Sequence, residues 1–247
     1  MPRTAKAYIT VVLCTGATVL FLAARSWNPT NLVPFFTLLG FVAISSTLKM
    51  RIPGIESTLS PNFVFLLVGM TVCSFSEVVA LALVAALVQS LWTTKGLRLV
   101  QVAFSVAALV LSASAAFECS RLLLSASASH SPLVFAVLAG SIYLPLNTAL
   151  VSGVIGLVSG KPFLRVGRAC FQSVFPYFMG GMAFAGLVGN AIPRIAVWNA
   201  TVALFPMVVL GYQYAQIHAK TAALATVQHD SMTNEGLDEV RSYRQRR

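Results

Sequence analysis

The feature that most constrains this chain is an apolar stretch, residues 132–160, that is long enough to cross a lipid bilayer. A membrane-spanning helix needs roughly 20 predominantly apolar residues. The stretch carries one strongly polar side chain near its middle, Asn147, and a basic connector with Lys161, Arg165 and Arg168 follows it. Lys and Arg collect on the cytoplasmic side of membrane proteins, so this pattern predicts a span that ends at the cytoplasmic face.

The composition of the whole chain is that of a membrane protein. Of its 247 residues, 57% are hydrophobic and 10% are charged, whereas a soluble domain carries about 25% charged residues. In a soluble protein the formal net charge of +10 would suggest nucleic-acid binding. In a membrane protein basic cytoplasmic loops explain the same excess, so we expect a lipid bilayer and no nucleic acid as partner.

Eight apolar segments alternate with polar connectors, and we predict each of them as a span. The third and fourth are shorter than an ideal span, so a single bent helix or a re-entrant pair is the alternative. Together they are too long for one crossing at about 1.5 Å per residue, which favours two short spans. The predicted spans are residues 7–24, 31–48, 62–74, 78–92, 99–124, 132–158, 169–190 and 195–214.

The distribution of Lys and Arg supports this division. Every second connector is basic, and the basic segments together hold 14 Lys and Arg against 3 in the segments between them. This alternation predicts an all-α bundle of eight transmembrane helices, residues 1–214, with both termini in the cytoplasm. A cytoplasmic basic tail, helical or disordered, follows at residues 215–247. The basic segments are the N-terminus, connectors 49–61, 93–98 and 159–168, and the tail; the others contain Arg25, Arg121 and Arg194.

The sequence lacks the motifs of the common enzyme classes. It contains no HExxH, no GxSxG, no phosphate-binding loop and no dinucleotide fingerprint. Its four cysteines stand alone, without the spacing of a zinc, iron–sulfur or haem site. We therefore expect no catalytic residues, no cofactor and no metal.

Three ionisable residues near the predicted outer ends of spans are candidates for a ligand site: Glu77, Glu118 and Arg121. Glu118 and Arg121 are three residues apart, so they share a helix face and can pair. One interpretation is a local ion pair at the membrane interface. The other is that these side chains form one wall of an outward-facing ligand site.

Asn147 is the other candidate, because an amide facing lipid would lack hydrogen-bond partners. It can form a helix–helix hydrogen bond, which is worth about 0.6–2 kcal/mol in a membrane. Alternatively it forms the polar floor of a pocket, together with Tyr143 one turn away on the same face.

Three stretches resemble the multi-span N-terminal sensor modules of bacterial HD-GYP and GGDEF signalling proteins. The first runs from Ser60 to Phe65, where a polar connector enters a short apolar segment, and the second from Tyr143 to Thr148. The third is a last span with Pro206, Tyr212 and Tyr214, followed by a cytoplasmic segment. The chain departs from those modules at Phe104-Ser105, where they often carry Phe-Asn.

The tail resembles the opening of an HD-GYP domain at four positions, Asp230, Thr233, Val240 and Tyr243. Glu235 and Gly236 stand where that family has glycine and a metal-binding histidine. No GGDEF string, HD pair or GYP follows, so the resemblance implies a sensor module without a complete output domain.

We therefore expect a membrane-embedded, non-catalytic sensory module in the bacterial inner membrane. It would bind a small-molecule ligand and signal through its tail to a cytoplasmic partner or to a second copy in a homodimer. Two alternatives from other classes stay open. One is a small-solute transport component resembling the substrate-binding subunit of an energy-coupling transporter, and the other is an accessory subunit of a larger membrane complex.

Overall fold

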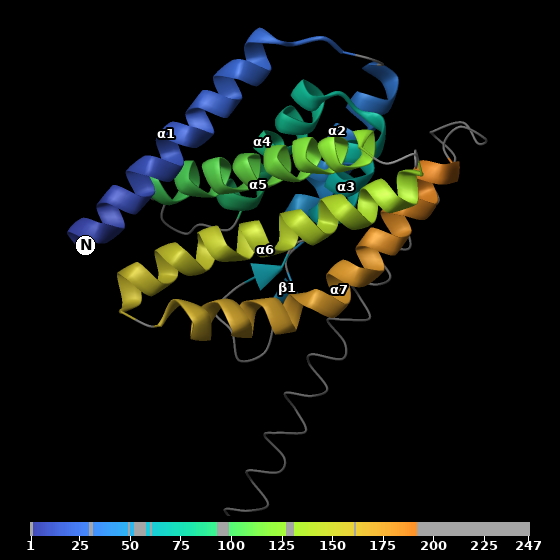
Figure 1. Cartoon of the computed structure of the whole chain (residues 1–247). Coiled ribbons are helices and arrows are strands. Elements are labelled where there is room, and N and C mark those ends of the chain that lie inside the picture. The colour runs from blue at the N-terminus through green and yellow to red at the C-terminus, as the bar shows by residue number, and fades with distance from the viewer. Residues whose placement is uncertain are drawn as a thin grey trace, which may run out of the picture.

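The structure, a computed structural model, describes residues 2–29, 32–48, 50–51, 58–59, 61–92, 99–126, 131–160 and 162–191. These residues form a bundle of helices with one short pair of strands (Figure 1). The predicted eighth span, residues 195–214, and the tail, residues 215–247, lie outside the described residues. The elements are α1 (Arg3–Arg25), α2 (Leu32–Thr47), β1 (Met50–Arg51), β2 (Thr58–Leu59), α3 (Asn62–Val72), α4 (Phe75–Leu91), α5 (Leu99–Ser125), α6 (Pro132–Ser159) and α7 (Phe163–Ala191).

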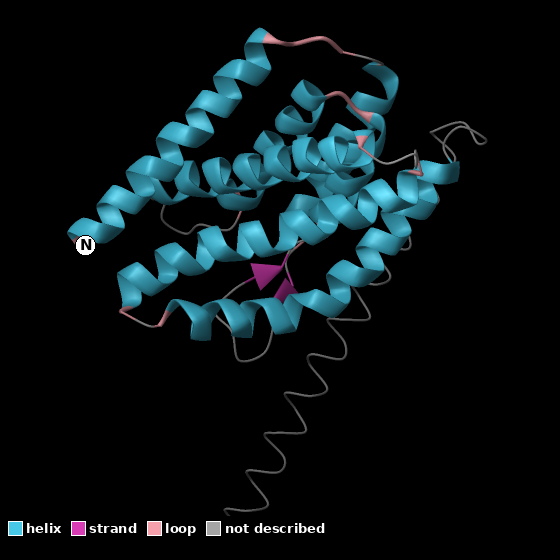
Figure 2. Cartoon of the chain, viewed as in Figure 1, coloured by secondary structure: helices cyan, strands magenta, loops and turns pink. Residues whose placement is uncertain are grey.

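The described part is helical apart from the strand pair, as the sequence predicts (Figure 2). The helices α1, α5 and α6 are each long and apolar enough to cross a membrane, and the two halves of α7 count as a fourth span if taken together. The helices α2, α3 and α4 are apolar but shorter. Many large apolar side chains face outward, among them Phe21, Phe36 and Leu187, each at least 60% exposed. Such a surface suits lipid rather than water.

Contacts between neighbouring helices show that their directions alternate. The hydroxyl of Tyr8 in α1 donates to the carbonyl oxygen of Leu150 in α6, 3.1 Å away, and the Tyr8 ring lies 6.2 Å from that of Phe104 in α5. The starts of α1 and α5 therefore lie beside the end of α6. At the opposite end of the bundle, the ring of Phe117 in α5 lies 6.0 Å from that of Phe135 in α6.

The remaining helices follow the same alternation. The helix α7 runs antiparallel to α6, since Gly186 near its end lies against Leu133 near the start of α6. The helix α3 runs parallel to α7 and antiparallel to α2. The ends of α2 and α4 meet at Thr47 and Leu91. We call the end where α1, α5 and α7 begin the basic end, because the exposed side chains Arg3, Lys6, Arg165 and Arg168 lie there.

The short helix α3 occupies the centre of the bundle. Nine of its 11 residues, Asn62 to Met70, are buried, and it packs against α2, α4, α6 and α7. At 1.5 Å per residue it spans about 16 Å, roughly half the thickness of a membrane core. Because neighbouring helices enclose it, this helix needs no surface that faces lipid.

Small residues let α7 approach α3 and α6 closely. Gly181, Ala185 and Gly189 are four residues apart and buried. A methyl group on Gly181 would overlap the ring of Phe63 in α3, and one on Gly189 would lie 2.9 Å from the Thr71 hydroxyl. This spacing of small residues is a common packing device between membrane helices.

The structure corrects two boundaries that the sequence suggests. The segment Phe75-Ser76-Glu77 reads as a connector before a span at residue 78, but it forms the first turn of α4. The basic connector 159–168 reads as a loop before a span at residue 169, but α7 already begins at Phe163. Gly160 ends α6 in the left-handed conformation with φ of 67°.

The connector between α2 and α3 also contains structure that the sequence does not suggest. The two-residue strands β1 and β2 pair antiparallel, with Met50 opposite Leu59 and Arg51 opposite Thr58. This pairing folds the connector back on itself before α3 begins.

Candidate functional site

Four aromatic side chains from three helices meet where α3 begins, and we call Phe63, Tyr143, Tyr177 and Phe178 the aromatic cluster. The rings of Phe63 in α3 and Phe178 in α7 stack with centroids 4.0 Å apart and planes inclined by 20°. The ring of Tyr177 meets Phe63 edge-on at 5.0 Å. Tyr143 in α6 lies 6.0 Å from Phe178. Contacts of this kind add about 0.5–1.5 kcal/mol each beyond the area they bury.

Two of the candidate residues from the sequence lie at this cluster or next to it. Tyr143 belongs to it and is 3% exposed. Asn147 follows one turn later along α6 toward the basic end and is half-buried. Within the described residues its amide makes no hydrogen bond, so the predicted helix–helix bond is not formed there.

A third polar residue next to the cluster, Asn62, was not singled out by the sequence analysis. It is the first residue of α3 and is 6% exposed. Its side-chain nitrogen donates to the Ser46 hydroxyl of α2 at 3.0 Å, and that hydroxyl donates to the carbonyl oxygen of Val42 at 2.6 Å. In the sequence, the feature that could have indicated this residue is a single amide at the start of an otherwise apolar segment.

Glu77 lies at the opposite end of the bundle, in the first turn of α4. Its side chain is 1% exposed. The backbone N–H of Ser74 donates to its carboxylate oxygen Oε2 at 2.7 Å, and its own N–H donates to the Ser74 hydroxyl at 3.4 Å. This reciprocal arrangement is a capping box, which satisfies backbone donors at a helix start. The carboxylate therefore has a local role in separating α4 from α3.

Glu118 and Arg121 lie in the last two turns of α5, also far from the aromatic cluster. Glu118 is half-buried and Arg121 is exposed. The part of the chain that the structure describes contains no ion pair between them. The five candidate residues thus occupy two regions, with Tyr143 and Asn147 in the interior and the three ionisable residues at the end opposite the basic end.

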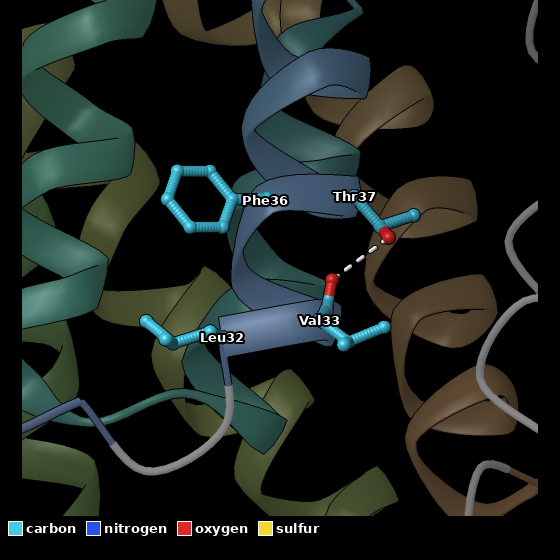
Figure 3. A pocket seen from close by; sticks show the side chains of 4 residues that line it. All are labelled: Leu32, Val33, Phe36 and Thr37. Carbon is cyan, nitrogen blue, oxygen red and sulfur yellow. Dashed lines mark hydrogen bonds between the residues drawn. The ribbon is translucent and has the colours of Figure 1, made fainter.

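Two surface grooves of the described residues are lined by side chains other than these five. One groove of about 330 Å³ lies on the outer face of α2 (Figure 3). There the Thr37 hydroxyl donates to the Val33 carbonyl oxygen at 2.8 Å, which leaves an almost wholly apolar surface. A second groove of about 460 Å³ lies between α2 and α4. The residues lining the first are Leu32, Val33, Phe36 and Thr37, and those lining the second are Ala43, Ile44, Thr47, Val88, Leu91 and Trp92.

Metal ligands do not gather in the described segments, where no three His, Cys, Asp or Glu side chains come together. The chemistry available at and beside the aromatic cluster includes stacked aromatic rings and the amides of Asn62 and Asn147. Such groups can hold a flat or weakly polar ligand by stacking and hydrogen bonds.

No protein-family model, no curated protein and no solved structure matches the chain. The resemblance to the sensor modules of HD-GYP and GGDEF proteins therefore stays a prediction that depends on the residues quoted for it.

Proposed function

We propose that this chain is a multi-pass membrane sensory module without a catalytic site of its own. A small-molecule ligand would bind among the helices near Tyr143 and Asn147, with Glu77, Glu118 and Arg121 as a second polar region at the other end. Binding would change the packing of α7, and the change would pass through the predicted last span to the tail. A cytoplasmic protein or a second copy of the chain would receive it there.

The observation that carries this proposal is the aromatic cluster, which joins the enclosed helix α3 to α6 and α7. A group that inserts beside these rings would separate helices that now touch. Because α3 is surrounded on all sides, it can move only if a neighbouring helix moves too. The helix α7 is the neighbour closest in sequence to the predicted last span and tail.

The two helices that pack beside α3 at the aromatic cluster, α6 and α7, each contain a proline near it. The two halves of α7, Phe163–Gln172 and Tyr177–Asn190, are inclined by 55°, and the sequence has a proline at position 176 in the break. In α6, Pro145 lies between Tyr143 and Asn147. Proline removes a backbone hydrogen bond and kinks a helix, and we propose that the two helices change their curvature at these points. A ligand with different affinities for the two arrangements would shift their populations.

The membrane arrangement that we propose has eight spans and both termini in the cytoplasm of a bacterial inner membrane. It is supported by the alternating helix directions and by the four exposed basic side chains at one end. The short helices α3 and α4 would count as two separate spans because the capping box at Ser74 ends one helix direction and begins the next.

A variant of Phe178 tests the route from the cluster to the tail. A nitroxide label on Ser231→Cys, in a chain whose native cysteines are replaced by alanine, would report the mobility of the tail in nanodiscs. We expect Phe178→Ala to change the spectrum, because it removes the ring that contacts both Phe63 and Tyr143. Leu187→Ala is the control, since Leu187 is in the same half of α7 but is 63% exposed.

An unchanged tail spectrum in folded Phe178→Ala protein would contradict the proposed route. Phe178→Leu keeps most of the apolar volume and replaces the alanine variant in this experiment if that variant does not fold.

Transport is the competing function, and it is tested with proteoliposomes supplied with radiolabelled vitamins, nucleosides and amino acids. Accumulation of one of these solutes inside the vesicles would favour a transport component over a sensor.

A further inference from the structure

The first turns of α7 form an exposed surface that combines two cations with two large apolar side chains. Arg165 and Arg168 are exposed, Phe163 is 45% exposed and Leu164 is 78% exposed. We call these four residues the α7 cationic surface. The same turns of α7 also contact α6, since Gly167 lies beside Ser152.

The bend in α7 sets this surface at an angle to the rest of the helix. The half that contains it, Phe163–Gln172, is inclined by 55° to Tyr177–Asn190. If the second half runs along the membrane normal, the first half is inclined by 55° to that normal. Helices at the membrane interface place apolar side chains among the acyl chains and Lys or Arg at the headgroups.

Further positive charge lies at the same end of the bundle. The contact between Tyr8 and Leu150 places the start of α1 beside the end of α6, and Arg3 and Lys6 in that first part of α1 are exposed. The two carboxylates of the described segments, Glu77 and Glu118, lie at the opposite end. Within those segments the cations at the basic end therefore have no carboxylate partner.

We propose that the α7 cationic surface binds an anionic phospholipid. Arg165 and Arg168 would donate hydrogen bonds to the headgroup phosphate, for which the guanidinium fork is well suited. Phe163 and Leu164 would lie against the acyl chains. The interaction does not depend on a sensory function, and it would hold the first half of α7 at the interface.

Lipid binding by the full chain tests this proposal. The protein in mild detergent is titrated with phosphatidylglycerol or with phosphatidylcholine, and bound lipid is counted by native mass spectrometry. We expect a preference for phosphatidylglycerol that falls as salt is added. Replacing Arg165→Gln and Arg168→Gln together should weaken its binding roughly 30-fold, since each cation near an anionic surface contributes about 1 kcal/mol.

The control is Arg25→Gln, which removes an exposed cation from the opposite end of the bundle. This variant should bind phosphatidylglycerol as the unaltered protein does. Arg165→Lys with Arg168→Lys keeps the charge and should retain most of the binding. Equal losses in the two glutamine variants, or no preference for phosphatidylglycerol in the unaltered protein, would overturn the proposal. A folded Arg165→Gln, Arg168→Gln protein that binds phosphatidylglycerol unchanged would do the same.

Discussion

Two asparagines in apolar helices have different environments, and the difference separates structural from functional roles. Asn62 is buried and donates to Ser46 at 3.0 Å. Asn147 is half-buried, and no hydrogen bond of its amide joins it to the described residues. A buried amide costs free energy unless it is paired, so Asn62 has a structural reason to be there. Asn147 lacks such a reason within the described part, which is why we place it near the proposed ligand.

Substituting each asparagine by alanine should separate these roles. We expect Asn62→Ala to lower the free energy of unfolding by about 0.6–1.7 kcal/mol, the range measured for hydrogen bonds between membrane helices. Asn147→Ala should lower it by less, because no described bond is lost. Thermal unfolding in mild detergent measures both. If Asn147→Ala lowers the free energy of unfolding more than Asn62→Ala does, Asn147 is a packing residue. Comparing the Ser46→Ala, Asn62→Ala double mutant with the two single mutants shows whether the Asn62 effect comes from the bond to Ser46.

At the scale of helices, the sequence predicts best where an apolar segment has a sharp boundary. The segment after Ser131 opens with proline and ends at glycine, and α6 runs from Pro132 to Ser159 as expected. The start of α4 was missed because Glu77 was read as a break in hydrophobicity. The Ser74-x-x-Glu77 spacing was the correct signal, since it is the pattern of a capping box. The start of α7 was missed because its arginines were counted as loop residues.

The close approach of α1 and α5 gives a prediction at the same scale. A methyl group on Gly16 of α1 would lie 2.6 Å from Ala107 Cβ and 2.8 Å from its Cα, so the two backbones would have to separate. We expect Gly16→Ala to lower the free energy of unfolding by about 1–3 kcal/mol through overpacking. Gly40→Ala in α2 is the control, since nothing lies within 4 Å of the added methyl. The control should be neutral or slightly stabilising, because alanine favours helix more than glycine does.

Thermal unfolding of the two glycine variants in the same detergent provides the measurement. Equal stability of Gly16→Ala and Gly40→Ala would mean that α1 does not approach α5 as the structure describes.

For the molecule as a whole, the sequence predicts the class and the order of helices but not their neighbours. The helical bundle follows from apolar segments and basic connectors that can be read directly. The stack of Phe63 on Phe178 joins helices that are distant in the chain, and no local pattern indicates it. The same holds for the central place of α3, whose apolar sequence fits a lipid-facing span equally well. Contacts between distant helices depend on the shapes of both partners.

The arrangement in the membrane can be tested directly. Fusions of alkaline phosphatase, active outside the cytoplasm, and of green fluorescent protein, active inside, are placed after Gly54, Lys95, Ser127, Gly160 and Lys220. We expect an external signal only at Ser127, because the other four lie within basic connectors or in the basic tail. An external signal at Gly160 or Lys220 would contradict eight spans with both termini in the cytoplasm.

The enclosure of α3 also has a consequence for how the chain is made. Its covering helices α6 and α7 are synthesised roughly 100 residues after it, on the order of 5–20 s later at the usual rate of translation. During that interval the newly made α3 has no neighbours on those sides and must be sheltered by lipid or by the insertion machinery. Its sequence, apolar except for Asn62 and Thr71, suits this temporary exposure. A polar substitution on the side that later meets α7 would therefore act before the protein is complete, as a defect of membrane insertion rather than of the finished bundle.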